Sequence, residues 1–229
     1  MSALSSYGSR AEPGTTPLVG QSVTVEPITD DRRFGELFAA YGQPDNESLY
    51  DYLPYGPFAD AAAFSEWANR TYLSGEMLFH ALVPATSGRA EGVAALMRMD
   101  RPNGVIEIGH ICLAPSLKRT VAATEAFFLL MGRVFDELGY RRFEWKCDDG
   151  NAPSKRAALR LGFRYEGLFR QHMIVKGRNR DTAWFSILDG EWPALRAGFE
   201  AWLAPENLDA AGRQRRSLED IRRAVMADR

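Results

Sequence analysis

The sequence has 229 residues, of which 45% are hydrophobic and 25% charged, and this globular composition excludes collagen, coiled-coil and wholly disordered architectures. Its 28 basic and 30 acidic residues give a formal net charge of −2, so bulk electrostatic attraction to nucleic acid is not expected. At about 150 residues per domain, the length predicts one domain with additional terminal segments.

The cysteine and histidine content excludes further classes of protein. Two cysteines outside any CxxC motif and three histidines argue against a disulfide framework or a zinc knuckle, and we expect no metal site. No apolar run approaches the ~20 residues of a membrane helix, and the first residues lack the basic and apolar blocks of a secretory signal. A cytoplasmic protein without membrane association is therefore expected.

Apolar periodicity predicts a mixed α/β domain that follows a flexible tail over residues 1–20, which are rich in Ser, Gly, Pro and Thr. Three consecutive strands read as an antiparallel meander, and a later strand–helix–strand order predicts a crossover with local parallel pairing. In chain order the predicted elements are a strand over 22–28, helices over 31–41 and 60–73, strands over 77–83, 92–99 and 105–113, a long helix stopped by Gly139, a strand over 143–147, a helix over 151–161, strands over 163–175 and 181–188 around a turn at 177–180, and helices over 191–203 and after a capping box at 217–220.

Two short segments are more specific than the element order. One is LAPSLKRTVAATEA over 113–126, which joins a strand to the long helix, and the other is NAPSKRAALRLGFRYEG over 151–167. The second segment matches the pattern N-x-x-S-x7-G-F-x-x-E-G, and further agreement follows downstream. The matching residues are Asn151, Ser154, Gly162, Phe163, Glu166, Gly167, Gly177, Asp181, Glu191 and Trp192.

On these residues the chain resembles the GNAT superfamily of acyl-CoA-dependent N-acetyltransferases, and within it the RimJ/RimL-like branch, over roughly 22–202. The resemblance implies a mixed, mostly antiparallel sheet that splays open and is flanked by helices. It also implies an acetyltransferase domain over 21–204, followed by a helical C-terminal extension over 205–229. Acetyl-CoA is the implied cosubstrate, lying between the splayed strands over 107–113 and 143–147.

The first segment is the place where the family binds the pyrophosphate of CoA, because a loop that enters a helix presents free backbone N–H groups to an anion. This chain departs from the family in having Val121 where a central glycine is usual. The alternative interpretation is a plain helix N-terminus with two solvated cations. The residues concerned are Lys118, Arg119, Thr120, Val121, Ala122, Ala123 and Thr124.

The second segment implies a further set of cofactor contacts. Asn151 is placed to bond the cofactor amides, and Ser154 to return a proton to the CoA sulfur, although both residue types are also common helix caps. Ile111, Leu113 and Arg156 complete the implied cofactor-binding set. The family's usual proton donor, a tyrosine, is replaced here by an alanine on the same helix.

Acetylation requires a neutral amine, which an α-amine supplies more readily than a lysine. Glu107, His110 and His172 are the candidate general bases, each weighed against a purely structural role. Strict alternation places Glu107 and His110 on opposite faces of their strand, so both reach one site only if the strand is bulged.

The loop over 51–58 is expected to line the acceptor pocket through Tyr52, Tyr55 and Phe58, whose alternative role is core packing. The leading hypothesis is direct acetyl transfer from acetyl-CoA to a primary amine, either a protein N-terminus or a small molecule. The alternative is a non-catalytic binding or scaffold protein on the same fold with weakened CoA affinity. The sequence leaves the acceptor and a homodimer open, the latter because the last segment carries an apolar stripe.

Overall fold

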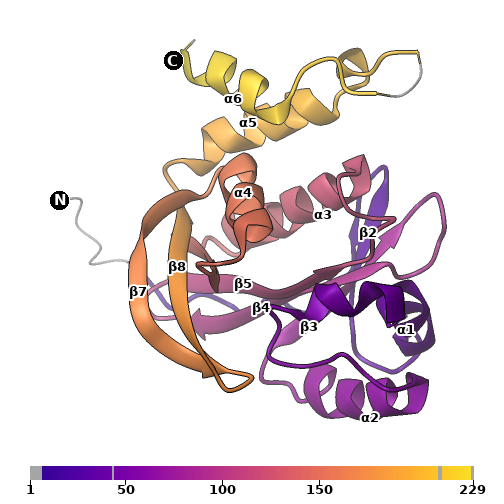
Figure 1. Ribbon diagram of the computed structural model, residues 1–229. Coiled ribbons are helices and arrows are strands. Elements are labelled where there is room, and N and C mark those ends of the chain that lie inside the picture. The colour runs from indigo at the N-terminus through magenta and orange to yellow at the C-terminus, as the bar shows by residue number, and fades with distance from the viewer. Residues whose placement is uncertain (1–6, 43, 211–212, 228–229) are drawn as a thin grey trace.

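The computed structural model describes residues 7–42, 44–210 and 213–227. Its strands form one sheet in the order β1-β2-β3-β4-β5-β6-β8-β7 (Figure 1). All paired neighbours are antiparallel except β5 and β6, so the predicted mixed, mostly antiparallel sheet is confirmed. The strands are β1 (Leu18–Val19), β2 (Val23–Pro27), β3 (Leu78–Pro84), β4 (Gly92–Asp100), β5 (Val105–Leu113), β6 (Arg142–Asp148), β7 (Arg164–Val175) and β8 (Arg178–Leu188).

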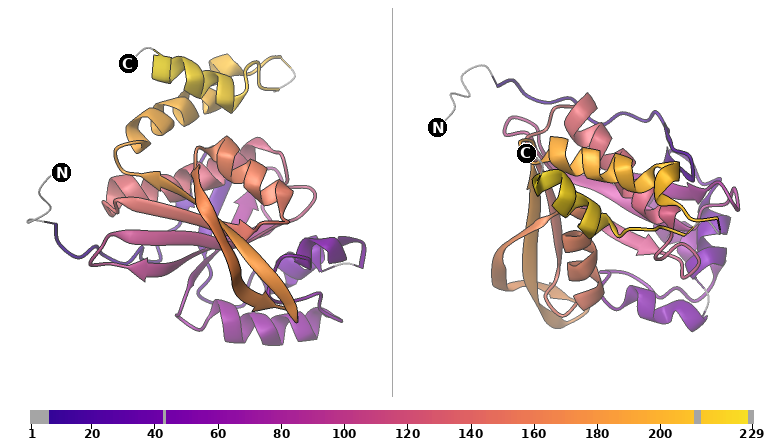
Figure 2. Two further views of the ribbon diagram at one scale, coloured as in Figure 1. Left: turned by 60° about the vertical axis from the view of Figure 1, so that its left-hand side comes forward. Right: turned by 90° about the horizontal axis from the view of Figure 1, so that it is seen from above.

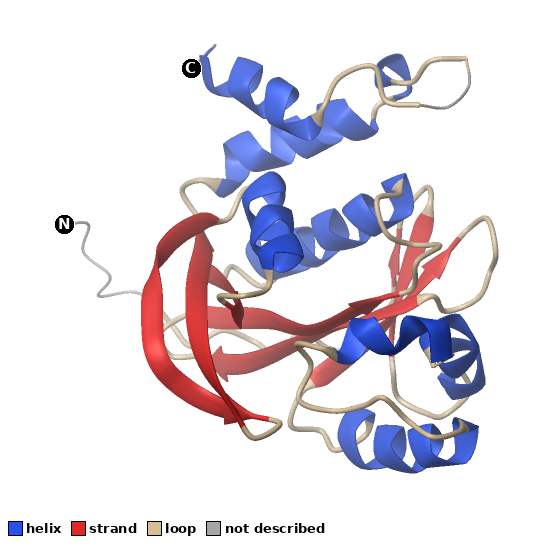
Figure 3. Ribbon diagram, viewed as in Figure 1, coloured by secondary structure: helices blue, strands red, loops and turns tan. Residues whose placement is uncertain are grey.

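Helices lie on both faces of this sheet, and each group of helices covers its own apolar core (Figure 3). One apolar core lies between the sheet and the helices that follow β5, and it extends across β6 and β8. The other core lies beneath the first two helices and involves β3, β4 and the end of β5. The helices are α1 (Phe34–Tyr41), α2 (Ala61–Tyr72), α3 (Val121–Gly132), α4 (Ala152–Leu161), α5 (Trp192–Leu203) and α6 (Leu218–Ala227).

The predicted crossover is confirmed, since β5, α3 and β6 connect two parallel strands. Beyond α3 the chain continues as one π-helical turn, Arg133–Glu137, before Gly139 ends the run with a φ of +66°. Gly162 ends α4 in the same way, with a φ of +105°, a region that glycine enters without a Cβ clash. Both predicted stop residues therefore end their helices.

The turn of the β7–β8 hairpin lies earlier than predicted. Val175 pairs with Arg178, so the loop consists of Lys176 and Gly177 alone, and 178–180 belong to β8. Both loop residues have positive φ, +49° and +72°, as a two-residue hairpin turn that follows the strand twist requires. Strand β8 is therefore three residues longer than predicted, and the polar side chains of 178–180 lie on it.

The segment predicted as a flexible tail lies against the fold over its described residues, 7–20. The Arg133 guanidinium donates hydrogen bonds to the carbonyl oxygens of Pro13, at 2.6 Å, and Thr16, at 3.2 Å. The Tyr140 hydroxyl donates to the carbonyl oxygen of Ala11 at 3.1 Å, and β1 adds an edge strand to β2. Composition missed this ordering because backbone carbonyls of any residue can accept such bonds; residues 1–6 lie outside the described chain.

The C-terminal helix α6 packs beside α5, as both views in Figure 2 show. Its start is capped as predicted, because the Asp220 backbone N–H donates to the Ser217 hydroxyl at 3.1 Å. The Arg222 guanidinium donates to the carbonyl oxygen of Arg160 on α4 at 2.7 Å. The last helix is thereby joined to the element that carries the second specific segment.

Candidate active site

One face of the sheet changes from apolar to polar between β4 and β8. Under α1 and α2 this face is packed with apolar side chains. On β6 and β8 the residues that alternate with the buried core members are polar or amphipathic, and directly opposed partners on the two strands share this face. The residues of this polar face are Glu144, Lys146, Asp148, Thr182, Trp184 and Ser186.

The parallel strands β5 and β6 separate in the middle of the sheet. Their pairing runs from Val105 opposite Arg142 to Ile108 opposite Trp145, and within the described chain it does not continue although both strands do. At the same point the pairing of β5 with β4 shifts register between Gly109 and Cys112. The backbone groups that face the gap are left without a partner strand, as the predicted splay requires.

The register shift is a bulge that turns His110 toward the face occupied by Glu107. His110 has a φ of +50°, and its ring stacks on Tyr55 with 5.6 Å between centroids and an interplanar angle of 2°. Arg98 hydrogen-bonds Glu107 and also acts electrostatically on the His110 ring. The strand is therefore bulged, as was required for Glu107 and His110 to reach one site, and both side chains border the same region.

Glu107 is buried within a chain of ion pairs. Its residue is 2% exposed, and its carboxylate accepts hydrogen bonds from Arg98 at 2.9 and 3.0 Å and from Lys146 at 2.8 Å. Lys146 also pairs with Glu144 at 2.8 Å, and its ammonium lies 3.8 Å from the centroid of the Trp184 ring. The carboxylate is therefore a paired, buried group at the point where β5 and β6 separate, not a solvated surface acid.

The two candidate histidines differ in surroundings. Burial, with Arg98 and Arg180 nearby, lowers the pKa of His110 to about 4, so this ring is neutral and a weak base at neutral pH. His172 is exposed, and its Nδ1 lies 2.9 Å from the Thr182 hydroxyl, which also accepts from Arg180 Nε at 3.2 Å. A guanidinium can only donate, so the Thr182 hydroxyl accepts from Arg180 and donates its own proton to His172 Nδ1. An Nδ1 atom that accepts a hydrogen bond carries no proton, so the ring proton of the neutral His172 is on Nε2.

The loop before α3 has the geometry of an anion site. Thr120 caps the helix by accepting the Ala123 N–H at 3.1 Å, whereas the N–H groups of Val121 and Ala122 have no acceptor among the described residues. The positive φ falls on Arg119, at +63°, and Val121 is an ordinary first helical residue. The branched side chain at 121 is therefore compatible with this backbone.

The start of α4 lies beside the gap between the strands. Asn151 is the N-cap, because its Oδ1 accepts the Ser154 N–H at 3.0 Å, while its Nδ2 has no partner among the described residues. The Ser154 hydroxyl accepts the Trp145 indole N–H at 3.0 Å and also hydrogen-bonds the Cys147 sulfur. Capping and cofactor contact are thus compatible roles. Ile111 and Leu113 are partly buried against the core, and Arg156 is exposed on α4.

The three aromatic residues of the 51–58 loop have different surroundings. Tyr55 and Phe58 pack against Trp67 on α2, with ring centroids 4.2 and 4.9 Å away, and they belong to the core under α1 and α2. Tyr52 is 40% exposed and donates to the Gly150 carbonyl at 3.0 Å. Tyr52 also lines a cavity.

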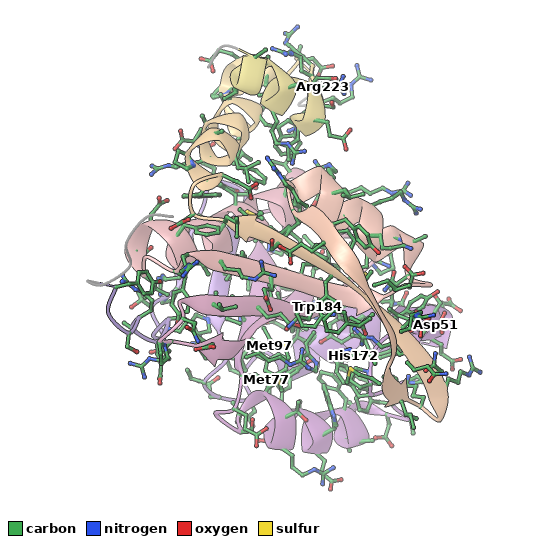
Figure 4. All side chains as sticks on the ribbon, turned by 90° about the vertical axis from the view of Figure 1, so that its left-hand side faces the viewer. Asp51, Met77, Met97, His172, Trp184 and Arg223 are labelled. Atoms are coloured by element: carbon green, nitrogen blue, oxygen red, sulfur yellow. The ribbon has the colours of Figure 1, made fainter. Side chains whose placement is uncertain are left out.

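That cavity lies between the loop and the tip of the β7–β8 hairpin and has a volume of about 280 Å³. Figure 4 shows Trp184, His172, Met97 and Met77 on the side of the molecule that carries the hairpin, with Asp51 near the hairpin tip. The cavity is lined by Asp51, Tyr52, Asp148, Val175, Lys176, Arg178, Asn179 and Arg180.

Sequence reasoning missed several residues of this region. Arg98, Lys146 and Trp184 lie on three different strands, and nothing in their local pattern indicates that they converge around Glu107. The polar residues 178–180 were predicted as part of a turn, whereas they belong to β8. The one available signal was the alternation of charged and apolar residues in β6, which predicts a polar face opposite the core.

The two cysteines are buried and unpaired, as expected for small apolar side chains in strands. Burial raises the pKa of the Cys112 thiol to about 12 and also raises the pKa of Cys147. Both thiols are therefore protonated at neutral pH and poor nucleophiles, which argues against an acyl-cysteine route.

Comparison with known proteins places this geometry in context. The family model described as an acetyltransferase (GNAT) domain matches residues 23–164. The crystal structure of a GCN5-related N-acetyltransferase from Brucella melitensis is 50% identical, covers 95% of this chain and 98% of that chain, and has a TM-score of 0.92. Among curated proteins, YdaF of Bacillus subtilis (strain 168), a candidate ribosomal N-acetyltransferase, is 31% identical over 101 residues, 44% of this chain and 55% of that protein.

A more distant structure shares the fold alone. The microcin C7 self-immunity acetyltransferase MccE, solved with acetyl-CoA and AMP, is 20% identical, covers 77% of this chain and 99% of that chain, and has a TM-score of 0.65. Within the described chain no group of His, Cys, Asp and Glu is arranged to hold a metal ion. No described helix is long and apolar enough to cross a membrane.

Proposed function

Because this chain belongs to the GNAT family of acetyltransferases, we propose that it moves the acetyl group of acetyl-CoA to a primary amine by direct attack. The observation that carries the proposal is the separation of β5 and β6 beside a buried, paired Glu107. We assign the activity to residues 21–204, with 205–229 as a helical extension. The likeness to YdaF supports a place in the RimJ/RimL-like branch.

The residues present fit the cosubstrate. Free N–H groups at Val121 and Ala122, with Lys118 and Arg119 beside them, suit a pyrophosphate at a helix N-terminus. The unpaired backbone of β5 and β6 beyond Ile108 suits the amides of pantetheine. The free Nδ2 of Asn151 offers one more donor at the mouth of the gap.

Acetyl-CoA supplies a thioester whose C–S bond breaks as the C–N bond forms, with one proton leaving the amine and one reaching the CoA sulfur. Glu107 is the carboxylate placed to receive the amine proton. Its oxygens already accept hydrogen bonds from Arg98 and Lys146, so the proton reaches it through a water molecule. The Ser154 hydroxyl is placed to donate the second proton. His172 Nε2–H serves as a donor toward the acceptor and not as the base.

Calorimetric titration of the protein with acetyl-CoA, followed by a panel of amines, tests this function. Micromolar binding and acetylation of at least one amine are expected. Absence of binding at millimolar acetyl-CoA would contradict the enzyme assignment and favour a non-catalytic binding protein on this fold. Val121 was the main reason for that alternative, and the positive φ at Arg119 instead of at residue 121 supports the enzyme proposal over it.

A further inference from the structure

The cavity at the hairpin tip is lined by charges of both signs that do not pair with one another. Lys176, Arg178 and Arg180 lie on the hairpin, Asp51 lies on the acceptor loop, and Asp148 ends β6. Within the described chain no ion pair joins any two of them. Asp51, Lys176 and Arg178 are exposed and Asp148 and Arg180 half-buried, so charges of both signs are available to a bound molecule.

Each of these charged side chains makes at most one hydrogen bond within the described chain. The Lys176 ammonium donates to the Tyr50 carbonyl at 2.8 Å, and the Arg180 guanidinium uses only Nε, on the Thr182 hydroxyl. The Asp148 carboxylate accepts the Gly150 N–H at 2.8 Å. The Arg178 guanidinium and the Asp51 carboxylate have no partner among the described residues.

The cavity is connected to the proposed reaction site. Asp148 is on the same face of β6 as Lys146, which binds Glu107. The Thr182 hydroxyl that accepts from Arg180 also bonds His172, and Arg180 is close enough to His110 to act on its ring electrostatically. A molecule in the cavity therefore lies next to the end of the gap between β5 and β6.

We propose that the acceptor is a small amine that also carries an anionic group, a carboxylate or a phosphate, bound by Arg180 and Arg178 while the amine lies toward Asp148. The inference rests on the acetyltransferase function proposed above and names its substrate class. A volume of about 280 Å³ is near the lower limit of small-molecule sites, roughly 300 Å³, and suits a molecule of amino-acid size.

Matched acceptor pairs test the proposal: free L-amino acids against their carboxamides, and O-phosphoethanolamine against ethanolamine. The carboxamide amine is the less basic one, so intrinsic reactivity at neutral pH favours the uncharged member of the first pair. We expect the anionic member to have the higher kcat/KM by about 10-fold to 100-fold, as hydrogen bonds to a charged group provide. The two pairs distinguish a carboxylate from a phosphate.

Arg180→Gln is expected to abolish the preference for the anionic acceptor while the KM for acetyl-CoA stays unchanged. Arg178→Gln is expected to reduce the same preference, and it provides a second test if the Arg180 variant folds poorly. Arg89→Gln, at an exposed turn away from the cavity, is the control and keeps the preference. Equal rates for both members of each pair, or better acetylation of peptide N-termini than of free amino acids, would overturn the inference while leaving the acetyltransferase function intact. Acetyl-CoA binding without transfer to any amine would contradict the proposed function itself.

Discussion

Replacing Glu107 by Gln separates the stabilising role of this carboxylate from its catalytic role. The side chains of Glu107 and Lys146 are 3% and 8% exposed and lie 2.8 Å apart, so the substitution leaves a buried ammonium with one partner fewer. Breaking a buried pair costs about 3–5 kcal/mol, and because Glu144 remains as a partner of Lys146, we expect a cost of about 3 kcal/mol here. For a chain of this size that loss lowers Tm by about 6–12 °C.

A double-mutant cycle with Lys146→Gln measures the coupling directly by urea unfolding. We expect a coupling of about 2 kcal/mol between the two buried side chains. The matched control is the pair Glu66 and Arg70 on α2, whose side chains are 70% and 67% exposed and whose coupling is expected to stay below about 0.5 kcal/mol. Equal coupling in the two cycles would show that Glu107 is solvated and that its assigned burial is wrong.

The catalytic role has its own readout. If Glu107 receives the amine proton, Glu107→Gln lowers kcat by about 10² to 10⁴ at neutral pH. The difference in kcat between this variant and the unsubstituted protein becomes smaller as pH rises toward the pKa of the acceptor amine, because that amine then loses its proton to solvent without a base. A pH–rate profile parallel to that of the unsubstituted protein, with kcat unchanged, would refute Glu107 as the base whatever the stability result.

Further predictions concern the cofactor helix, the histidines and the N-terminal segment. Asn151→Ala removes the cap of α4, costs about 1 kcal/mol and raises the Kd for acetyl-CoA, whereas Ser154→Ala lowers kcat with that Kd unchanged; titration and turnover of both variants check this pair. Burial lowers the pKa values of His80 and His110 to about 4, so the unfolded chain, with histidine pKa values of about 6.5, takes up protons first. Stability is therefore full above about pH 6.5 and is lost as pH falls, by about 2 kcal/mol per histidine at pH 5; urea unfolding at both pH values measures it, and an unchanged slope in His80→Gln would contradict the assignment. Arg133→Gln removes the donor that holds the N-terminal segment and should speed tryptic cleavage there, with no gain in cleavage as the contrary result.

Local signals in the sequence were enough to predict most of the fold. Gly139 and Gly162 end helices because each adopts a positive φ, and Ser217 begins one because its hydroxyl accepts a backbone N–H. The hairpin turn was displaced because Lys176 adopts a positive φ that its residue type does not indicate. Such a choice is made by the pairing of Val175 with Arg178 across two strands, which no local pattern contains.

The candidate site was predictable only in part. Asn151, Ser154 and the loop before α3 are contiguous segments whose roles follow from helix ends, and the structure places them there. The partners of Glu107 come instead from β4 and β6, which meet β5 only through the order of strands in the sheet. Long-range convergence of this kind is a property of topology, so spacing along the chain does not reveal it.

The bulge in β5 explains why the site forms where it does. Because His110 turns toward the Glu107 face and stacks on Tyr55, the cover supplied by the 51–58 loop reaches the proposed reaction site. Beyond that contact the sheet face is polar, and the β7–β8 hairpin supplies the facing wall with its cations. The register shift thus falls where β5 and β6 separate and where the apolar cover ends, so the proposed cosubstrate gap and the proposed acceptor cavity meet at this part of β5.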